Sequence, residues 1–404
     1  MIAHVVIGAN YGDEGKGSVV QRLSSMSKFG EPTLVVMTNG GAQRGHTVVS
    51  ETGERYVNKH FHSGWLEGAD CLFARSFILN PMEFAVEYNR NKPVMSSPNM
   101  REPVFYRDEK CYWTTPWDMI ANQAISNLNG NHNSCGMGIW ETKSRGYHSI
   151  SGGTLNEFCA MPYDRQIDWL EFIRKSKLDR LEPYLDKLSK NFKKLFTDAE
   201  MIRGLEDHFI NDCKFMLEHT INVDLDEDMY QEVVGNKIEC WFTSMKYKHI
   251  IFENGQGLAI GEQNIGDIDI QTPSHTGLLG ALPGYFPDWL KKHATEINVH
   301  YVSRTYLTRH GDGEMDNFCE RQTLSSYIEE DKTNQFNQFQ GGLKYGALDC
   351  MALQARILND LKNGPDAIRD SVKTVLDFTH CDERGPEGLV VTGMDQINYY
   401  GGVR

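Results

Sequence analysis

The sequence predicts an α/β protein: a single large domain with a central mostly parallel sheet, glycine-rich ligand loops at strand ends and peripheral helices. Two apolar runs, residues 2–7 and 33–37, each lead directly into a glycine-rich stretch, as buried strands that open onto loops do. Three further apolar runs are followed by polar or glycine-containing residues: 249–257, 297–303 and 374–380. We expect residues 1–404 to form one catalytic domain, because no linker-like stretch divides them.

The first two strands end in loops that read GANYGDEGKGS (8–18) and NGGAQRGHT (39–47). Open α/β sheets bind their ligands in the crevice outside the carboxyl ends of the strands. We therefore expect the two loops to meet at the ends of neighbouring strands. Between about 160 and 250 the chain is charged and contains leucines near helical spacing, which predicts a peripheral helical segment.

The charge of the chain argues against two classes of partner. Proteins that bind nucleic acid or anionic membranes usually carry a basic face, whereas this chain has a formal net charge of -14. We therefore expect neither partner. The nine cysteines include no CxxC pair, which disfavours a zinc ribbon or a disulfide scaffold. No apolar run approaches the ~20 residues that span a bilayer. We expect a cytoplasmic protein with reduced thiols.

The first loop is typical of a phosphate site. Its glycines allow backbone amides to approach an anion, and Lys16 adds positive charge at the start of a helix. The loop lacks the GxxxxGK[ST] pattern of a Walker A motif. Carboxylates beside phosphates indicate a cation or a proton transfer, so Asp13 is a candidate for chemistry. The simpler alternatives are that Asp13 caps the helix, that His46 is an ordinary loop residue and that Lys16 lies on the surface.

A series of motifs resembles the adenylosuccinate synthetase family. GDEGKG and GHT carry the most specific part of the resemblance, and the remaining motifs follow in the family's order. The motifs are GDEGKG (12–17), GHT (45–47), FENGQG (252–257), QTPSHTG (271–277), TRHGDG (308–313), ALD (347–349), THCD (379–382) and VTG (391–393). The resemblance covers nearly the whole chain and is weak between about 100 and 250.

The resemblance implies a ligase that condenses L-aspartate with C6 of a purine nucleoside monophosphate through a 6-phosphoryl intermediate. Asp13 matches the base that removes the purine N1 proton. His46 and Lys16 match groups that stabilise charge during transfer of the terminal phosphate. The family pattern also implies Mg²⁺ held by Asp13 and the Gly45 carbonyl, and a homodimer in which Arg145 reaches the partner's substrate.

The resemblance assigns three sets of binding residues. Those for the nucleoside triphosphate are Gly12, Glu14, Gly15, Lys16, Gly17, Gly45, His46, Thr47, Asp382, Thr392 and Gly393. Those for the purine monophosphate are Asp13, Gln43, Ser134, Cys135, Arg145, Gln256 and Thr272. Those for aspartate are Gln340, Gly341, Gly342 and Lys344.

Several loops depart from the family pattern. The arginine-rich aspartate loop is replaced by residues 334–346, in which Lys344 is the only cation. His380 replaces the lysine of the guanine-reading motif, which makes ATP a candidate beside GTP. SCGMG replaces the threonine-rich phosphate loop, and Gln43 replaces an asparagine that contacts the base. These changes favour the divergent phage branch, the 2-aminoadenylosuccinate synthetases, which act on dGMP.

Three alternatives stay open at this point. The retained Asp13 also fits an ordinary GTP-dependent enzyme that acts on IMP. A P-loop-like kinase or GTPase would share the glycine-rich loop but would not need His46 in a second loop. A nucleotide-binding regulatory protein without catalysis would not need Asp13 and His46 together.

Overall fold

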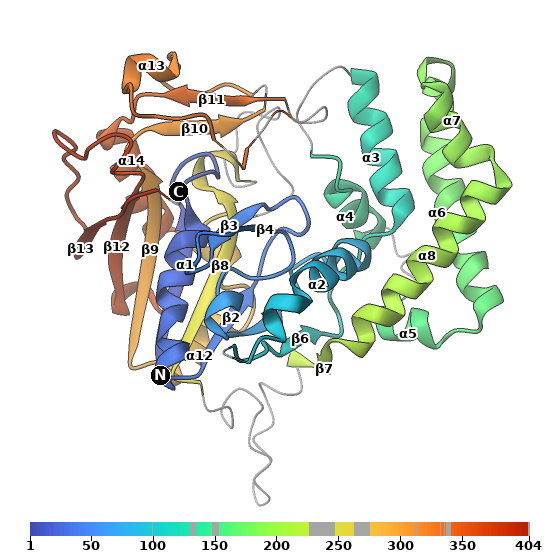
Figure 1. Ribbon diagram of the computed structural model, residues 1–404, viewed down its shortest axis with the longest axis horizontal. Helices are drawn as coiled ribbons and strands as arrows, with labels where there is room; N and C mark the ends of the chain where they lie inside the picture. The colour runs from blue at the N-terminus through green and yellow to red at the C-terminus, as the bar shows by residue number, and fades with distance from the viewer. Residues whose placement is uncertain are drawn as a thin grey trace, which may run out of the picture.

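The computed structural model describes residues 1–98, 100–129, 135–147, 153–225, 247–261, 275–311, 313–331, 333–334, 336 and 341–402. Within them lies a nine-stranded sheet whose order is β13-β12-β9-β1-β8-β2-β5-β6-β7 (Figure 1). Its strands are β1 (Ile2–Gly8), β2 (Thr33–Met37), β5 (Asp70–Phe73), β6 (Phe105–Asp108), β7 (Ile221–Val223), β8 (His249–Gly257), β9 (Glu296–Arg304), β12 (Val372–Thr379) and β13 (Gln396–Tyr399). Every neighbouring pair is parallel, which confirms the predicted fold class.

One detail of the expected topology is wrong. The strands that precede the two glycine-rich loops are not neighbours, because β8 lies between β1 and β2: His249 pairs with both Ile2 and Thr33. The loops therefore flank the carboxyl end of β8. This order brings the polar end of β8, Glu253 to Gln256, between them.

Apolar residues cover both faces of the central strands. Val6 on β1 packs with Val19 and Val20 of α1 (Lys16–Ser24). Successive side chains of a strand point to opposite faces, so Val5 packs on the other side. That side is covered by α11 (Leu278–Ala281), α12 (Phe286–His293) and α14 (Cys350–Lys362). The sheet is thus a buried layer between helices.

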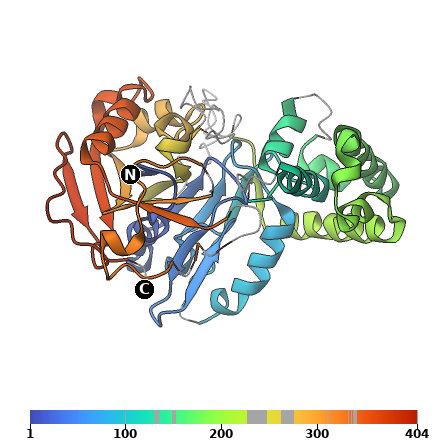
Figure 2. The ribbon, with the colours of Figure 1, turned by 90° about the horizontal axis from the view of Figure 1, so that it is seen from above.

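Most of the other helices form a lobe at one end of the sheet (Figure 2). They are α2 (Pro81–Met95), α3 (Pro116–Asn129), α4 (Ile139–Tyr147), α5 (Leu155–Ala160), α6 (Tyr163–Leu181), α7 (Lys190–Thr197) and α8 (Ala199–Glu218). Rings of Trp113, Phe158, Trp169 and Phe209 pack together in its core. The predicted helical character holds as far as Glu218, after which the chain enters the edge strand β7; residues 226–246 lie outside the described part.

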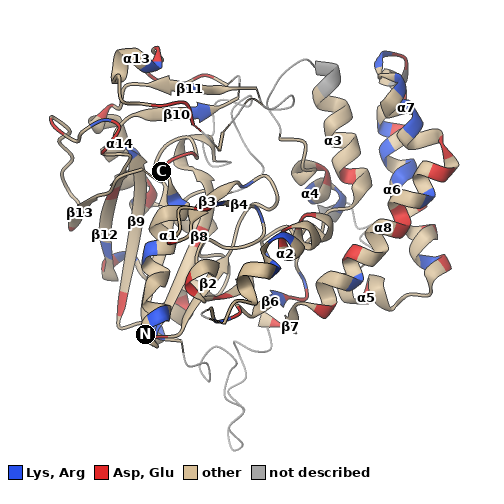
Figure 3. Cartoon of the chain, in the orientation of Figure 1, with Lys and Arg blue, Asp and Glu red and all other residues tan. Residues whose placement is uncertain are grey.

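Charges of both signs alternate along the outer helices of this lobe (Figure 3). On α6, Arg165 pairs with Asp168 and Lys175 pairs with Glu171, at helical spacings of three and four residues. Among the described residues, no helix is both long enough and apolar enough to cross a membrane.

Two small antiparallel sheets of two strands each lie at the carboxyl end of the main sheet (Figure 1). One pairs β3 (His46–Val49) with β4 (Arg55–Asn58), and the other pairs β10 (Leu307–His310) with β11 (Leu343–Gly346). The remaining short elements are η1 (Ser25–Phe29), η2 (Trp65–Glu67), η3 (Glu182–Lys187), η4 (Leu258–Ile260), η5 (Arg369–Ser371) and α13 (Arg321–Leu324).

Candidate active site

One pocket lies where the first loop, the β3–β4 hairpin and β9 meet. It collects residues from five stretches of the chain that lie far apart in the sequence. Its walls are Gly12, Asp13, Gly15, Lys16, Gly17, Ser18, Gly45, His46, Thr47, Arg55, Arg304, Asp331, Thr333, Asn334 and His380. The two glycine-rich loops therefore share one pocket, although their strands are separated by β8.

The backbone of the first loop requires glycine at Gly15 and at Gly17. Gly15 precedes α1 with a φ of 88°, in the left-handed region that favours glycine. A Cβ at Gly17 would lie 2.7 Å from the carbonyl oxygen of Thr47, so glycine lets α1 approach the second loop. Since Gly15 is the cap residue and no side chain caps α1, Asp13 is not a helix cap.

Glu14 and Lys16 form a buried pair inside the loop. Glu14 Oε1 accepts hydrogen bonds from the amides of Asn10 (3.0 Å) and Gly12 (2.7 Å). Its Oε2 lies 3.0 Å from Lys16 Nζ, which also donates to the Gly12 carbonyl. Glu14 thus holds the shape of the loop, whereas Lys16 lines the pocket. An anion that binds Lys16 shares it with Glu14.

Asp13 is held through its backbone. Its carbonyl oxygen accepts hydrogen bonds from Arg304 Nε (2.6 Å) and from Thr308 Oγ1 (3.3 Å). Burial raises the pKa of its carboxyl group, while the positive fields of His310 and Arg304 oppose that rise. A carboxylate with a raised pKa is a better proton acceptor than an ordinary aspartate, which suits a general base.

His46 is fixed by a buried carboxylate. Glu253, in the middle of β8, contacts His46 Nδ1 through Oε1, and the same oxygen lies 3.1 Å from Arg44. Arg44 and the other contacts hold the pKa of Glu253 well below its usual range, so it is an acceptor and His46 Nδ1 carries the proton. Burial and Arg44 lower the pKa of His46 to about 4, so its ring is neutral at pH 7.

Ser63 completes this cluster. Its amide donates to Glu253 Oε2 (2.9 Å) and its hydroxyl donates to Oε1 (2.6 Å). The Glu253 side chain is fully buried, so its charge is balanced entirely by these protein contacts. Sequence reasoning did not select Glu253 as a site residue. The signal was there, because a single carboxylate ends the apolar run HIIF of a buried strand.

Asp331, Thr333 and Asn334 also line the pocket. Asp331 Oδ2 pairs with Arg304 (2.8 Å), and its Oδ1 accepts hydrogen bonds from the amides of Thr333 and Asn334. The Thr333 hydroxyl lies 2.9 Å from the Thr47 hydroxyl. Arg304 therefore connects these residues to the backbone of Asp13. None of these contacts could be deduced from motif order alone.

The residues predicted to bind the purine nucleotide lie in different places. Gln256 lies near the end of β8 with a φ of 61°, and its backbone packs against Gly12 of the first loop. Gln43 Oε1 is buried and accepts no hydrogen bond from the described residues. Cys135 lies just before α4, and burial raises the pKa of its thiol. Ser134 and Thr272 lie outside the described residues.

Arg145 is anchored within the helical lobe. On α4 it pairs with the buried carboxylate of Asp118 (3.2 Å) and donates to the Trp113 carbonyl at 2.5 Å. It lines a separate cavity together with Lys177 and Arg180 of α6. In this single chain, Arg145 does not line the pocket that holds Asp13.

The remaining predicted triphosphate residues lie beyond β12. Asp382 accepts a hydrogen bond from the Gly402 amide at 2.5 Å, and Thr392 donates to Gln354 Oε1. Gly393 has a φ of 78°. The pocket walls include His380 but not these three residues.

The predicted aspartate residues lie along β11 and the loop before it. The Gly341 carbonyl accepts from His310 Nε2 (3.0 Å), and Lys344 Nζ donates to the Gly313 carbonyl (3.2 Å). Gly342 and Lys344 line a hollow whose walls include Asp331 and Asn334. Those two residues also line the pocket of Asp13, so the two spaces adjoin. Gln340 lies outside the described residues.

The donor set of the pocket fits a magnesium ion that is held jointly with phosphates. Asp13 and Gly45 supply a carboxylate and a carbonyl oxygen to the same pocket. Among the described residues, no group of three or more His, Cys, Asp or Glu forms a self-contained metal site. Magnesium prefers oxygen ligands and commonly binds through one or two carboxylates together with substrate phosphates.

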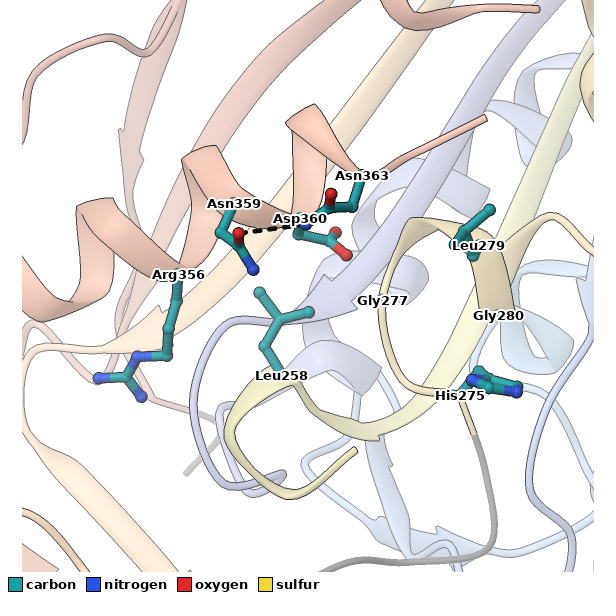
Figure 4. A pocket seen from close by; sticks show the side chains of 9 residues that line it. All are labelled: Leu258, His275, Gly277, Leu279, Gly280, Arg356, Asn359, Asp360 and Asn363. Carbon is teal, nitrogen blue, oxygen red and sulfur yellow. Dashed lines mark hydrogen bonds between the residues drawn. The ribbon is translucent and has the colours of Figure 1, made fainter. Parts of the chain in front are cut away.

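A second cavity lies between α14 on one side and Leu258 and residues 275–280 on the other (Figure 4). Arg356, Asn359 and Asp360 of α14 line it from one side, and His275 lines it from the other. Asp360 accepts hydrogen bonds from the Tyr301 hydroxyl (2.7 Å) and from a backbone amide. Asp360 is thus part of the packing between α14 and the sheet.

The stability of the protein should depend on the protonation of Asp360. Burial raises the pKa of Asp360 to about 6, above the value of about 3.9 for an unfolded aspartate. The native state then holds a proton that the unfolded state releases, so this group adds stability as the pH falls from about 6 to about 4. Asp360→Asn keeps an acceptor oxygen and removes the titration.

We expect the difference in unfolding free energy between Asp360→Asn and the unaltered protein to change by on the order of 2 kcal/mol between pH 7.5 and pH 4.5. Relative to the unaltered protein, the variant should be more stable at pH 7.5 than at pH 4.5. Urea unfolding at both pH values measures this difference, in which all other titrating groups cancel. An equal difference at the two pH values contradicts the assignment.

The sequence of the chain is similar to that of a known protein family. Residues 5–361 match the family model for adenylosuccinate synthetase. An adenylosuccinate synthetase of Borrelia duttonii is 24% identical over 285 residues, which cover 70% of this chain and 57% of the relative. One of Acaryochloris marina is 23% identical over 317 residues, which cover 76% of this chain and 61% of the relative. The chain thus spans less than two thirds of the length of these relatives.

Two solved structures share the fold. A fully ligated adenylosuccinate synthetase from Plasmodium falciparum superposes with a TM-score of 0.63 at 17% identity, covering 94% of this chain and 77% of that one. A succinoaminodeoxyadenylate synthetase of cyanophage S-2L, bound to dGMP and dATP as an energy donor, superposes with a TM-score of 0.59 at 13% identity. The match covers 95% of this chain and 85% of that one. The two scores are similar, so they do not distinguish the two branches.

Proposed function

Because the chain belongs to the adenylosuccinate synthetase family, we propose that it is a ligase that joins L-aspartate to C6 of a purine nucleoside monophosphate. ATP or GTP supplies the phosphate for a 6-phosphoryl intermediate. The observation that carries the proposal is the convergence of Asp13, Lys16 and His46 on one pocket. A kinase or GTPase has no need of the Glu253–His46 pair, and a purely regulatory nucleotide site has no need of a carboxylate with a raised pKa.

The proposed chemistry has two steps. Asp13 removes the N1 proton of a 6-oxopurine, and O6 then attacks the terminal phosphorus of the nucleoside triphosphate while the diphosphate leaves. The loop amides and Lys16 stabilise the charge on the transferring phosphate, and His46 donates to it once the phosphates favour its protonated form. The amine of aspartate next attacks C6, and phosphate leaves with the former O6. Mg²⁺, held by Asp13 and Gly45, would neutralise phosphate charge when bound.

We propose dGMP as the favoured monophosphate. The loss of arginines from the aspartate loop and the rebuilt loop around Gln43 support this choice. A pocket without partners for the ribose hydroxyl leaves no buried group unsatisfied when a deoxyribose binds. The buried, unpartnered Gln43 Oε1 offers an acceptor for an exocyclic amino group. IMP is the second candidate, because Asp13 is retained. The enzyme is further proposed to act as a homodimer.

The test is a matrix of reactions. Purified protein with Mg²⁺ and aspartate is given IMP, GMP or dGMP together with ATP or GTP, and both phosphate release and the purine product are followed. We expect aspartate-dependent product with dGMP. Product from IMP but not from dGMP would retain the ligase and reject the dGMP assignment. Absence of an aspartate-dependent product in every combination would reject the ligase.

A further inference from the structure

One face of the β3–β4 hairpin presents two polar side chains, Thr47 and Arg55, to the pocket. Thr47 pairs with Val57 and Val49 pairs with Arg55, so Thr47 and Arg55 are diagonal neighbours on the same face. Gln21 of α1 fixes this register, because its side-chain amide bonds to both backbone groups of Val49 (2.7 and 3.1 Å). The helix that follows the phosphate loop therefore sets the position of Arg55.

Thr333 joins these two side chains. Its hydroxyl oxygen accepts a hydrogen bond from Arg55 at 3.0 Å and lies 2.9 Å from the Thr47 hydroxyl. Asp331 holds Thr333 in this place by accepting its amide hydrogen bond at 2.9 Å. The negative charge of Asp331 is matched by Arg304 at 2.8 Å. A neutral oxygen thus contacts Arg55 inside an anion pocket.

We propose that Arg55 is a further binding residue for the terminal phosphates of the nucleoside triphosphate, and that the Thr333 hydroxyl holds its guanidinium in place until a phosphate oxygen takes over the contact. The inference rests on the proposed function only in that the pocket receives a triphosphate.

The chemistry of the pocket favours this role. Two other cations of the pocket, Lys16 and Arg304, contact the carboxylates of Glu14 and Asp331, respectively. Each of these cations offers a phosphate an attraction that its carboxylate partner reduces. Arg55 meets a hydroxyl oxygen at Thr333, and a phosphate oxygen in that position forms a stronger, charge-assisted hydrogen bond. A guanidinium also binds phosphate through two parallel donors, which a lysine cannot do.

Inorganic tripolyphosphate with Mg²⁺ tests the inference without any purine or aspartate. Calorimetry gives its Kd for the unaltered protein, Arg55→Gln and Arg55→Lys. We expect Arg55→Gln to weaken binding at least about tenfold, as the loss of a charge-assisted pair does. The Kd of Arg55→Lys should lie between those of Arg55→Gln and the unaltered protein. The matched control is Arg90→Gln, since Arg90 supports the same hairpin through the Val57 carbonyl but does not line the pocket.

The control should bind tripolyphosphate as the unaltered protein does. Equal affinity of Arg55→Gln and the unaltered protein overturns the inference, and so does a failure of the unaltered protein to bind tripolyphosphate. Equal losses in Arg55→Gln and Arg90→Gln would assign Arg55 to the folding of the hairpin and would also overturn it. Because the assay involves no turnover, its outcome is separate from that of the ligase test.

Discussion

Asp13→Asn is expected to lower kcat by about 10²–10⁴-fold, the usual contribution of a positioned general base. The amide cannot accept the N1 proton, so O6 of the purine does not become nucleophilic. The loop should keep its shape, because Arg304 and Thr308 bind the backbone carbonyl of Asp13 rather than its side chain. KM for the triphosphate is expected to change by less than kcat, even if a metal contact weakens.

Steady-state kinetics with the most active substrate pair measure this effect. Asp349→Asn is the matched control, because Asp349 caps α14 through the amides of Met351 and Ala352, and asparagine caps helices about as well. Its kcat should equal that of the unaltered protein. Retention of full turnover by Asp13→Asn would remove Asp13 from the mechanism.

Glu253→Gln is expected to reduce both stability and turnover. The substitution leaves Arg44 and His46 buried without the carboxylate that both contact. Removal of one partner of a buried ion pair costs about 3–5 kcal/mol, because the other charge stays desolvated. Turnover should also fall, by roughly 10²-fold or more, because His46 loses the acceptor that fixes its Nδ1 proton and the orientation of its ring.

Urea unfolding and kcat of the folded protein separate the two effects. Glu87→Gln is the control: Glu87 is also a buried carboxylate, and it accepts hydrogen bonds from the amides of His60 and Phe61. The control is expected to lose stability but to keep kcat. If Glu253→Gln and Glu87→Gln reduced kcat equally, Glu253 would have only a structural role.

Much of the fold could be predicted from local patterns. The strands at 2–7 and 33–37 and the three later segments are rich in apolar residues on both faces, as strands buried on both sides are. Four strands of the sheet were not predicted: β7 has three residues, and β5, β6 and β13 have four each, too few for a pattern. The insertion of β8 between β1 and β2 is a long-range pairing that no local signal records.

The site shows the same division. Asp13, Lys16 and His46 could be identified because each lies in a glycine-rich loop that follows a strand. Arg55 and Thr333 could not, since their contact joins positions that lie 278 residues apart. Arg304 acts through the backbone of Asp13, a role that depends on geometry rather than on residue type.

The central claim is that O6 of the purine becomes phosphorylated before aspartate displaces it. The most direct measurement uses a purine monophosphate labelled with ¹⁸O at position 6, together with Mg²⁺, aspartate and the triphosphate that supports turnover. Mass spectrometry of the released phosphate reports the fate of the label. The proposed mechanism predicts one ¹⁸O atom in each phosphate released per purine product. Product formed together with unlabelled phosphate would contradict the 6-phosphoryl intermediate.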